Sequence, residues 1–176
     1  GDAAGASPTL SWAALQALGI DDDGSFGVRV RATYGNGQQG TSNPATLAVV
    51  NTAPTAGLTN TGPAGEGSPV TVSFVNPADP SAADTAAGFR YSFDFDNDGT
   101  FEITDGGLAS VAAPAQFLSD AGTRTIRGVI RDKDGGAAEL FTEVTVLEVR
   151  PTLILAGDDT AAEGAIYTLH LSATDP

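Results

Sequence analysis

The most concentrated chemistry in the sequence is an acidic run that ends in a glycine turn. Three aspartates alternate with other residues in Asp94-Phe95-Asp96-Asn97-Asp98-Gly99. Carboxylates at this spacing can converge on one hard cation, and calcium takes about six to eight oxygen ligands. Glu102 and Asp105 follow at later ligand positions. The run therefore predicts a calcium site. The alternative is an acidic turn whose aspartates accept hydrogen bonds from backbone amides.

Composition excludes several other kinds of chemistry. The 176-residue chain has no cysteine and one histidine, and its 8 basic and 22 acidic residues give a formal charge of −14. It therefore lacks a thiolate nucleophile, a cysteine zinc ligand and a disulfide. An acidic chain repels nucleic acid, and no apolar run approaches the length of about 18 residues that marks a membrane span. Paired carboxylates can hydrolyse glycosides, but these lie on expected loops without a pocket, so we expect no enzyme.

The chain repeats itself with a period of about 97 residues. Four short matches recur in the same order at offsets of 96 to 98: Val28–Thr33 with Ile126–Arg131, Ala53-Pro54-Thr55 with Arg150-Pro151-Thr152, Glu66-Gly67 with Glu163-Gly164, and Asp79-Pro80 with Asp175-Pro176. Such a period predicts tandem modules. Residues 1–52 form the C-terminal part of one repeat, 53–150 a complete repeat, and 151–176 the N-terminal strands of a third.

Apolar residues alternate with polar residues along most of the chain, which is typical of strands with one wet face. Val70, Val72 and Phe74 alternate with Thr71 and Ser73, for example. We place strands in the complete repeat at 54–60, 69–75, 88–95, 100–104, 109–117, 123–131 and 138–147, and a single helical turn between Leu10 and Leu18. Short strands in units of about 97 residues predict an all-β, immunoglobulin-like sandwich without the disulfide.

The complete repeat resembles the PKD (polycystic-kidney-disease) domains. Residues 89–99 carry an aromatic residue, an Asp-aromatic pair and an acidic glycine turn, with Phe93 in place of the usual tryptophan. Residues 122–136 resemble the next-to-last strand and its turn, and residues 144–146 resemble the closing strand. Arg124 stands where the family has tyrosine and Gly128 where it has a larger apolar residue, as in a divergent, cadherin-like relative. The resemblance implies tandem modules of large bacterial surface or secreted proteins.

A second set of acids gathers at the expected joints between repeats, because loops from different strands meet at each end of such a sandwich. The joint before the complete repeat would collect Asp21, Asp22, Asp23, Asn51, Asp79, Asp84, Asp132 and Asp134; the joint after it would collect Glu66, the acids of 94–98, Asp120 and Asp175. Like charges at short range repel. Calcium would convert this repulsion into a strut, as the resemblance to cadherin-like arrays implies. The alternative is that these acids only provide solubility.

Three single residues have ordinary expected roles. Lys133 is the only lysine and lies in a turn between two aspartates, so we expect it to be solvated or ion-paired rather than crosslinked. Trp12 is expected to pack in a core. His170 lies on the polar face of a strand and is expected to be solvated.

These features favour a structural or adhesive segment of a large extracellular, bacterial cell-surface or fibre-forming protein, stiffened by calcium. Its partners would be neighbouring repeats of the same or of identical chains. The alternative is an accessory module of a secreted enzyme that binds polysaccharide or protein. An exposed aromatic platform would favour that alternative, yet most of the 12 aromatic residues fall on inward strand positions.

Overall fold

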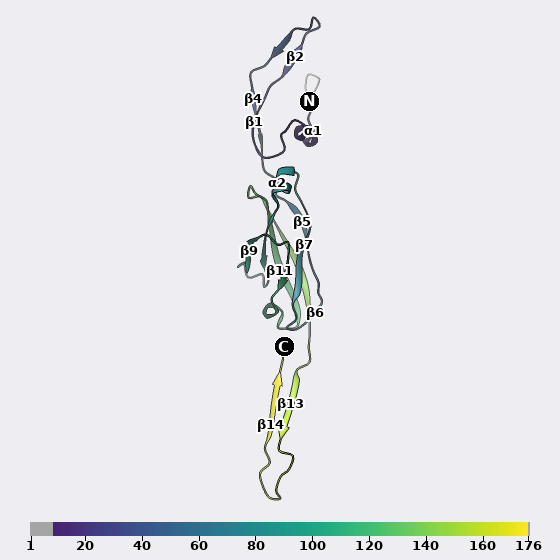
Figure 1. The fold of residues 1–176 in the computed structure, drawn as a ribbon, viewed down its shortest axis with the longest axis vertical. Helices are drawn as coiled ribbons and strands as arrows, with labels where there is room; N and C mark the ends of the chain where they lie inside the picture. The colour runs from purple at the N-terminus through teal and green to yellow at the C-terminus, as the bar shows by residue number, and fades with distance from the viewer. Residues whose placement is uncertain (1–8, 176) are drawn as a thin grey trace. The chain divides into compact units, whose positions relative to one another are not determined.

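The structure, a computed structural model, describes residues 9–175 and consists mostly of strands (Figure 1). Its helices are α1 (Trp12–Ala17), α2 (Ala82–Ala87) and the 3-10 helix η1 (Ala115–Leu118). Its strands are β1 (Gly24–Val28), β2 (Arg31–Thr33), β3 (Gln39–Thr41), β4 (Ala45–Val49), β5 (Thr55–Asn60), β6 (Ala64–Gly65), β7 (Val70–Ala78), β8 (Arg90–Asp94), β9 (Ile103–Gly106), β10 (Ser110–Ala113), β11 (Gly122–Arg131), β12 (Ala137–Leu147), β13 (Thr152–Gly157) and β14 (Leu169–Thr174). None of the described helices has the length and apolar character needed to cross a membrane.

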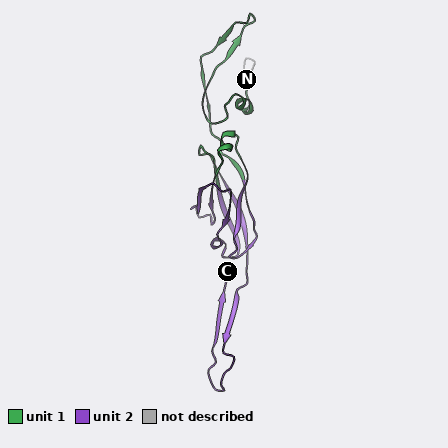
Figure 2. Cartoon of the chain, viewed as in Figure 1, with its two compact units in different colours: residues 1–56, 76–90, 129–138 green, residues 57–75, 91–128, 139–176 purple. Residues whose placement is uncertain are grey.

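The chain divides into two compact units (Figure 2). Unit 1 comprises residues 1–56, 76–90 and 129–138, and unit 2 comprises 57–75, 91–128 and 139–176. The boundaries fall within β5, β7, β8, β11 and β12, whose residues belong partly to each unit. Unit 1 holds α1, α2 and two antiparallel pairs, β1 with β4 and β2 with β3.

Unit 2 contains the core of a β-sandwich. One sheet has the strand order β10-β7-β5, and the other has the order β6-β12-β11-β8-β9. Phe74 of the first sheet lies with its ring centroid 5.0 Å from that of Tyr91 and 5.3 Å from that of Phe93, both on the second sheet. Phe93 in turn stacks on Phe95. The fully buried side chains around them are Val70, Val72, Leu118, Ile126 and Val144.

The strand assignments are confirmed to within a few residues, as is the helical turn near Trp12, except that the predicted strand 109–117 is shorter. It ends with β10 at Ala113, and the 3-10 helix η1 occupies Ala115–Leu118. The all-β sandwich is therefore confirmed as the fold class. Two elements have no counterpart among the sequence predictions. Strand β6 pairs in parallel with β12, and α2 interrupts what the sequence indicates only as a loop.

The prediction of one wet face per strand is wrong for β8. Ser92 and Asp94 are buried together with Tyr91 and Phe93. A register shift between β8 and β9 turns Asp105 N toward Ser92 Oγ at 2.9 Å, and the turn after β8 folds back over Asp94. The prediction also fails in the opposite sense for β14, whose residues are all exposed.

Gly128 shows why a larger residue is absent from that position. A Cβ there would lie 2.7 Å from Phe74 Cζ and 3.1 Å from Leu58 Cδ2, and real Cβ atoms do not come so close to other heavy atoms. The Phe74 ring occupies the space that a larger side chain at 128 would need. At this one position the core is therefore filled by the Phe74 ring of β7 and not by a side chain of β11.

Candidate cation site

Helix α2 positions the most deeply buried acid of unit 1. Ser81 caps the helix, and its Oγ accepts a hydrogen bond from Asp84 N at 3.1 Å, as serine commonly does at this position. This cap places Asp84 in the first turn, with its side chain turned inward and none of it exposed. Asp79 N-terminal to the cap accepts a hydrogen bond from Ser81 N at 2.8 Å. A single turn of chain thus fixes both carboxylates.

Part of this acidic charge has no hydrogen-bond partner. Asp79 Oδ2 and both oxygens of Asp84 are buried and accept no hydrogen bond within the described part of the chain. Asp132, which is 3% exposed, completes a group in which one carboxylate oxygen of each residue lies within 4.8 Å of the others. Buried carboxylates are stable only with compensating positive charge or hydrogen bonds. These three acids therefore form a candidate site for a cation.

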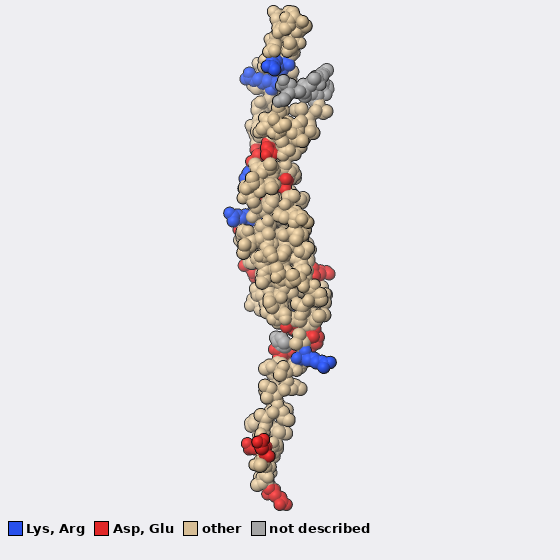
Figure 3. Space-filling model, turned by 45° about the vertical axis from the view of Figure 1, so that its right-hand side comes forward, with Lys and Arg blue, Asp and Glu red and all other residues tan. Residues whose placement is uncertain are grey.

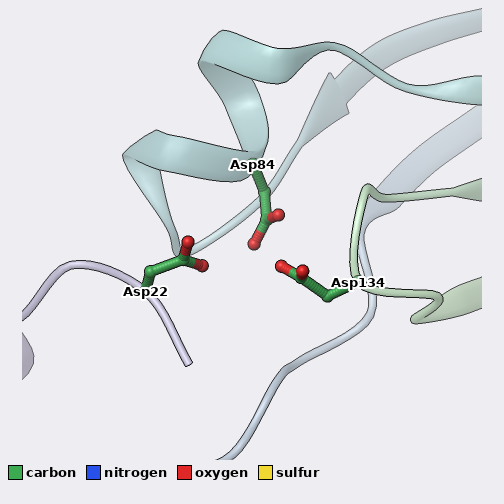
Figure 4. Close-up of side chains that lie close together, drawn as sticks. All are labelled: Asp22, Asp84 and Asp134. Carbon is green, nitrogen blue, oxygen red and sulfur yellow. The ribbon is translucent and has the colours of Figure 1, made fainter. Parts of the chain in front are cut away.

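Lys133 supplies one positive charge on the other side of Asp84. Its Nζ lies 2.6 Å from Asp22 Oδ2 and 3.3 Å from Asp84 Oδ1, and it also contacts Asp134. Figure 4 shows the carboxylates of these three aspartates pointing toward one another from separate segments. Their oxygens again lie within 4.8 Å of one another. The prediction that Lys133 is ion-paired is confirmed.

The pKa shifts in this cluster follow from burial and from Lys133. Burial raises the pKa of the Asp84 carboxyl, even though the lysine and the Ser81 hydroxyl act in the opposite direction. The hydrogen bond from Lys133 lowers the pKa of Asp22, and the hydrogen bonds to Asp134 and Asp22 raise the pKa of the lysine. Desolvation, followed by the charge of Asp134, raises the pKa of Asp23. The lysine and the Ser81 hydroxyl thus offset only part of the cost of burying the charged Asp84 carboxylate.

The turn between β11 and β12 holds Asp132 rigidly. Asp132 Oδ1 accepts hydrogen bonds from Asp134 N at 2.9 Å and from Gly136 N at 2.8 Å. Asp132 Oδ2 accepts one from Asn51 Nδ2 at 3.0 Å. Gly136 must be small because a Cβ there would collide with Asp132 Oδ2 and lie 2.8 Å from Asn51 Nδ2. This turn therefore brings the linker residue Asn51 to the acidic cluster.

A cavity of about 290 Å³ opens beside the cluster in unit 1. Its lining includes Trp12, Asp22, Asp79 and Asp84. Trp12 is half-buried, and its Nε1 donates a hydrogen bond to the carbonyl oxygen of Pro80 at 2.8 Å. The only tryptophan of the chain therefore lies beside the candidate site. The prediction that Trp12 simply packs in a core did not include this position.

The acidic run after β8, in unit 2, has a different character. Asp94 is fully buried, and its carboxylate accepts hydrogen bonds from Asp98 N at 3.2 Å and Gly99 N at 3.0 Å. Glu102 accepts one from Phe95 N at 2.8 Å. Arg127 adds a positive charge 3.8 Å from Asp94 Oδ2. Asp94, Asp96 and Glu102 do approach within 4.8 Å of one another, but, unlike Asp79 and Asp84, none of them has a buried carboxylate oxygen without a hydrogen-bond partner.

The remaining predicted ligands fall into two classes. The first class accepts hydrogen bonds elsewhere: Asp98 from Thr100 N, Asp21 from Gln16 Nε2, and Glu66 from Ala121 N and Val149 N. The second class, Asp23 and Asp105, is exposed and lies outside the acidic groups found among the described residues. Of the twelve sequence-predicted ligands, the structure brings Asp22, Asp79, Asp132 and Asp134 to the buried Asp84.

No family model matches the chain, and no curated protein matches it. Among solved structures, the fold is similar to one described as "Structural basis for the promiscuous specificity of the carbohydrate-binding modules from the beta-sandwich super family", with a TM-score of 0.44 and 15% sequence identity. The similarity covers 72% of this chain and 56% of that one, so the chain spans little more than half the length of that protein.

Replacing Asp94 with alanine tests the structural role of the acidic run. Loss of its carboxylate leaves the amides of Asp98 and Gly99 without acceptors, so we expect the free energy of unfolding to fall by about 2–4 kcal/mol. Urea denaturation in EDTA and in calcium should give the same loss. The exposed Asp96→Ala is the control, with an expected change within about 0.5 kcal/mol. A loss seen only in calcium would instead identify the run as an ion site.

Proposed function

We propose that the chain is a non-catalytic β-sandwich segment of an extracellular or cell-surface repeat protein, in which calcium bound at the Asp79–Asp84–Asp132 group stiffens the chain. The observation that carries this proposal is the buried Asp84 carboxylate, whose Oδ2 has no partner among the described residues. The calcium site and its stiffening role follow from the need to neutralise that charge.

The charge balance of the cluster supports a divalent cation. Two acidic groups share Asp84, and together they contain five carboxylates, those of Asp22, Asp79, Asp84, Asp132 and Asp134. The ammonium of Lys133 contacts three of the five, Asp22, Asp84 and Asp134. Like charges at this separation destabilise one another strongly when they are removed from water. Calcium prefers an all-oxygen shell that carboxylates and backbone carbonyls can supply. A calcium ion would therefore both satisfy the unpartnered oxygens and offset the excess charge.

The origin of the ligands supports a stiffening role. Asp22 precedes β1, Asp79 and Asp84 flank the start of α2, and Asp132 begins the turn between β11 and β12. These segments are far apart in the sequence but belong to the same compact unit. An ion that binds them together would restrict segments that otherwise meet through only a few polar contacts, such as the bond from Asn51 to Asp132.

The positions of the strands support a repeated architecture. Strand β13 begins 97 residues after β5, at Thr152 and Thr55, and β14 falls on the region 97 residues after β7. Strand β1 begins 98 residues before β11. These offsets match the sequence period, and they are the basis for proposing tandem modules of a long surface or fibre-forming protein.

Calcium should stabilise the chain, and Asp84 should be required for the effect. Ligand binding to the native state stabilises by RT ln(1 + [L]/Kd), about 2.7 kcal/mol at a hundredfold excess over Kd. We therefore expect millimolar calcium to raise the melting temperature by about 5–10 °C relative to EDTA. The isosteric Asp84→Asn variant should lose this shift.

The matched control removes one negative charge from an exposed position, as Asp159→Asn. It should retain the whole calcium shift. The proposal fails if the parent chain shows no shift, or if Asp84→Asn keeps it.

A second candidate function, polysaccharide binding, is favoured by a hollow in unit 2. This hollow has a volume of about 490 Å³ and is lined mostly by polar side chains. The lining residues are Asp96, Asn97, Gln116, Phe117, Ser119, Asp120, Thr123, Arg124 and Thr125. One aromatic ring beside several hydrogen-bonding side chains is an arrangement that can bind the hydroxyl groups of a sugar. The exposed aromatic residues of the described chain, Tyr34, Phe141 and Tyr167, are not part of it.

Removing two hydrogen-bonding groups from this hollow tests the second candidate. If the hollow binds polysaccharide, Gln116→Ala combined with Arg124→Ala should weaken retention on an insoluble polysaccharide about tenfold or more, because each lost bond costs about 1 kcal/mol. Co-sedimentation with a panel of insoluble polysaccharides measures the effect. Arg150→Ala removes an exposed arginine outside the hollow and should bind like the parent. Absence of retention by the parent chain would remove this candidate.

A further inference from the structure

The carboxylates of Asp22, Asp84 and Asp134 converge on one point (Figure 4). The ammonium group of Lys133 lies among them. It contacts all three carboxylates at once. No other lysine is present in the sequence. The cluster therefore already holds a cation, and this cation is covalently attached to the chain.

Two acidic groups share Asp84. The first, Asp22–Asp84–Asp134, surrounds the ammonium of Lys133, and the second, Asp79–Asp84–Asp132, meets that ammonium at Asp84. A divalent ion bound in the second group would share the Asp84 carboxylate with the ammonium of Lys133. The two cations would then be separated by that one carboxylate. Two cations at such a short separation repel each other.

We propose that Lys133 is a tethered counter-ion that competes with calcium for Asp84 and thereby sets the calcium concentration at which the cluster fills. This inference rests on the proposed calcium site and states how that site is regulated. At low calcium the ammonium holds Asp22, Asp84 and Asp134 together. At high calcium the ion takes the carboxylates and the lysine side chain leaves.

The side chain of Lys133 is built for such an exchange. It is 31% exposed, so it has a direct route to solvent. Its stem carries a compact point charge that rotates freely, whereas a guanidinium would make fixed, two-pronged contacts. The hydrated ammonium loses little on release, and a calcium ion with twice the charge gains more from the same oxygens. Exchange therefore requires no rearrangement of α2 or of the β11–β12 turn.

Calcium titration by isothermal calorimetry, at fixed ionic strength, tests the competition. Lys133→Gln removes the competing charge, so we expect its Kd for calcium to be about tenfold lower than that of the parent, or lower still. The same variant should melt at a lower temperature in EDTA, because three carboxylates then face one another without the ammonium. Lys133→Arg keeps the charge and should bind calcium no more tightly than the parent. Arg150→Gln removes an exposed positive charge elsewhere and should leave the Kd unchanged.

The outcomes separate this inference from the proposed function. If the parent binds calcium and Lys133→Gln binds it no more tightly, the competition is refuted while the calcium site stands. If only Lys133→Gln binds calcium, the competition is supported and the proposed function of the parent chain is refuted. If neither binds, both are refuted.

A single lysine also permits a direct observation of its release. Nitrogen-15 labelling of lysine gives one side-chain ammonium signal, which slow exchange in the carboxylate cluster should make visible in EDTA. Calcium should broaden this signal away or move it to the position of a free lysine. A signal that stays unchanged while calcium binds, as judged by calorimetry, would overturn the exchange.

Discussion

A carboxylate removed from water must find positive charge or hydrogen-bond donors, and the buried Asp84 sets this requirement for the whole of unit 1. Its position is dictated locally, since the Ser81 cap turns it inward from the first turn of α2. The surrounding groups are best understood as responses to it. Lys133 reaches it from the β11–β12 turn, while Asp79 and Asp132 add charge that the lysine cannot balance alone.

Asp94 shows the opposite solution to the same problem. It is as deeply buried as Asp84, but the turn after β8 directs two backbone amides onto it and Arg127 approaches from β11. Asn97 and Gly99 adopt positive φ values of 56° and 96°, which allow the chain to fold back over the carboxylate. One aspartate is thus satisfied by its own loop, and the other depends on charge brought from distant segments. Figure 3 shows Lys and Arg as a few small patches on the face that it draws.

The strands of unit 2 were predictable because apolar and polar residues alternate along the sequence, and the apolar residues are the ones that the sandwich buries. Val70, Val72 and Phe74 face inward as their spacing indicates. The roles of the acids were harder to predict. The sequence shows that Asp94 and Asp84 are acidic, but it does not show which hydrogen-bond donors lie near them. The gathering of Asp22, Asp79, Asp84 and Asp132 followed from loop topology alone. The contact of Lys133 with three of the cluster's acids could not be derived, because it depends on the reach of a single side chain across a turn.

The alternation of apolar and polar residues gave wrong predictions of burial where neighbouring segments cover an outward face or leave an inward face exposed. Ser92 and Asp94 occupy nominally outward positions of β8, yet the bulge with β9 and the following turn cover them. In β14 the same pattern predicts one buried face, but every residue is exposed because the described chain provides no second layer there. Periodicity reports which residues share a face, and only packing decides whether that face is covered.

Trp12 offers the most direct way to detect a cation at Asp84. It is the only tryptophan and lines the same cavity as Asp22, Asp79 and Asp84. Terbium(III) binds oxygen ligands as calcium does and emits when a nearby tryptophan is excited. Titration with terbium should produce sensitised emission that excess calcium suppresses and that Asp84→Asn abolishes. No sensitised emission, or emission undiminished in Asp84→Asn, would contradict the account.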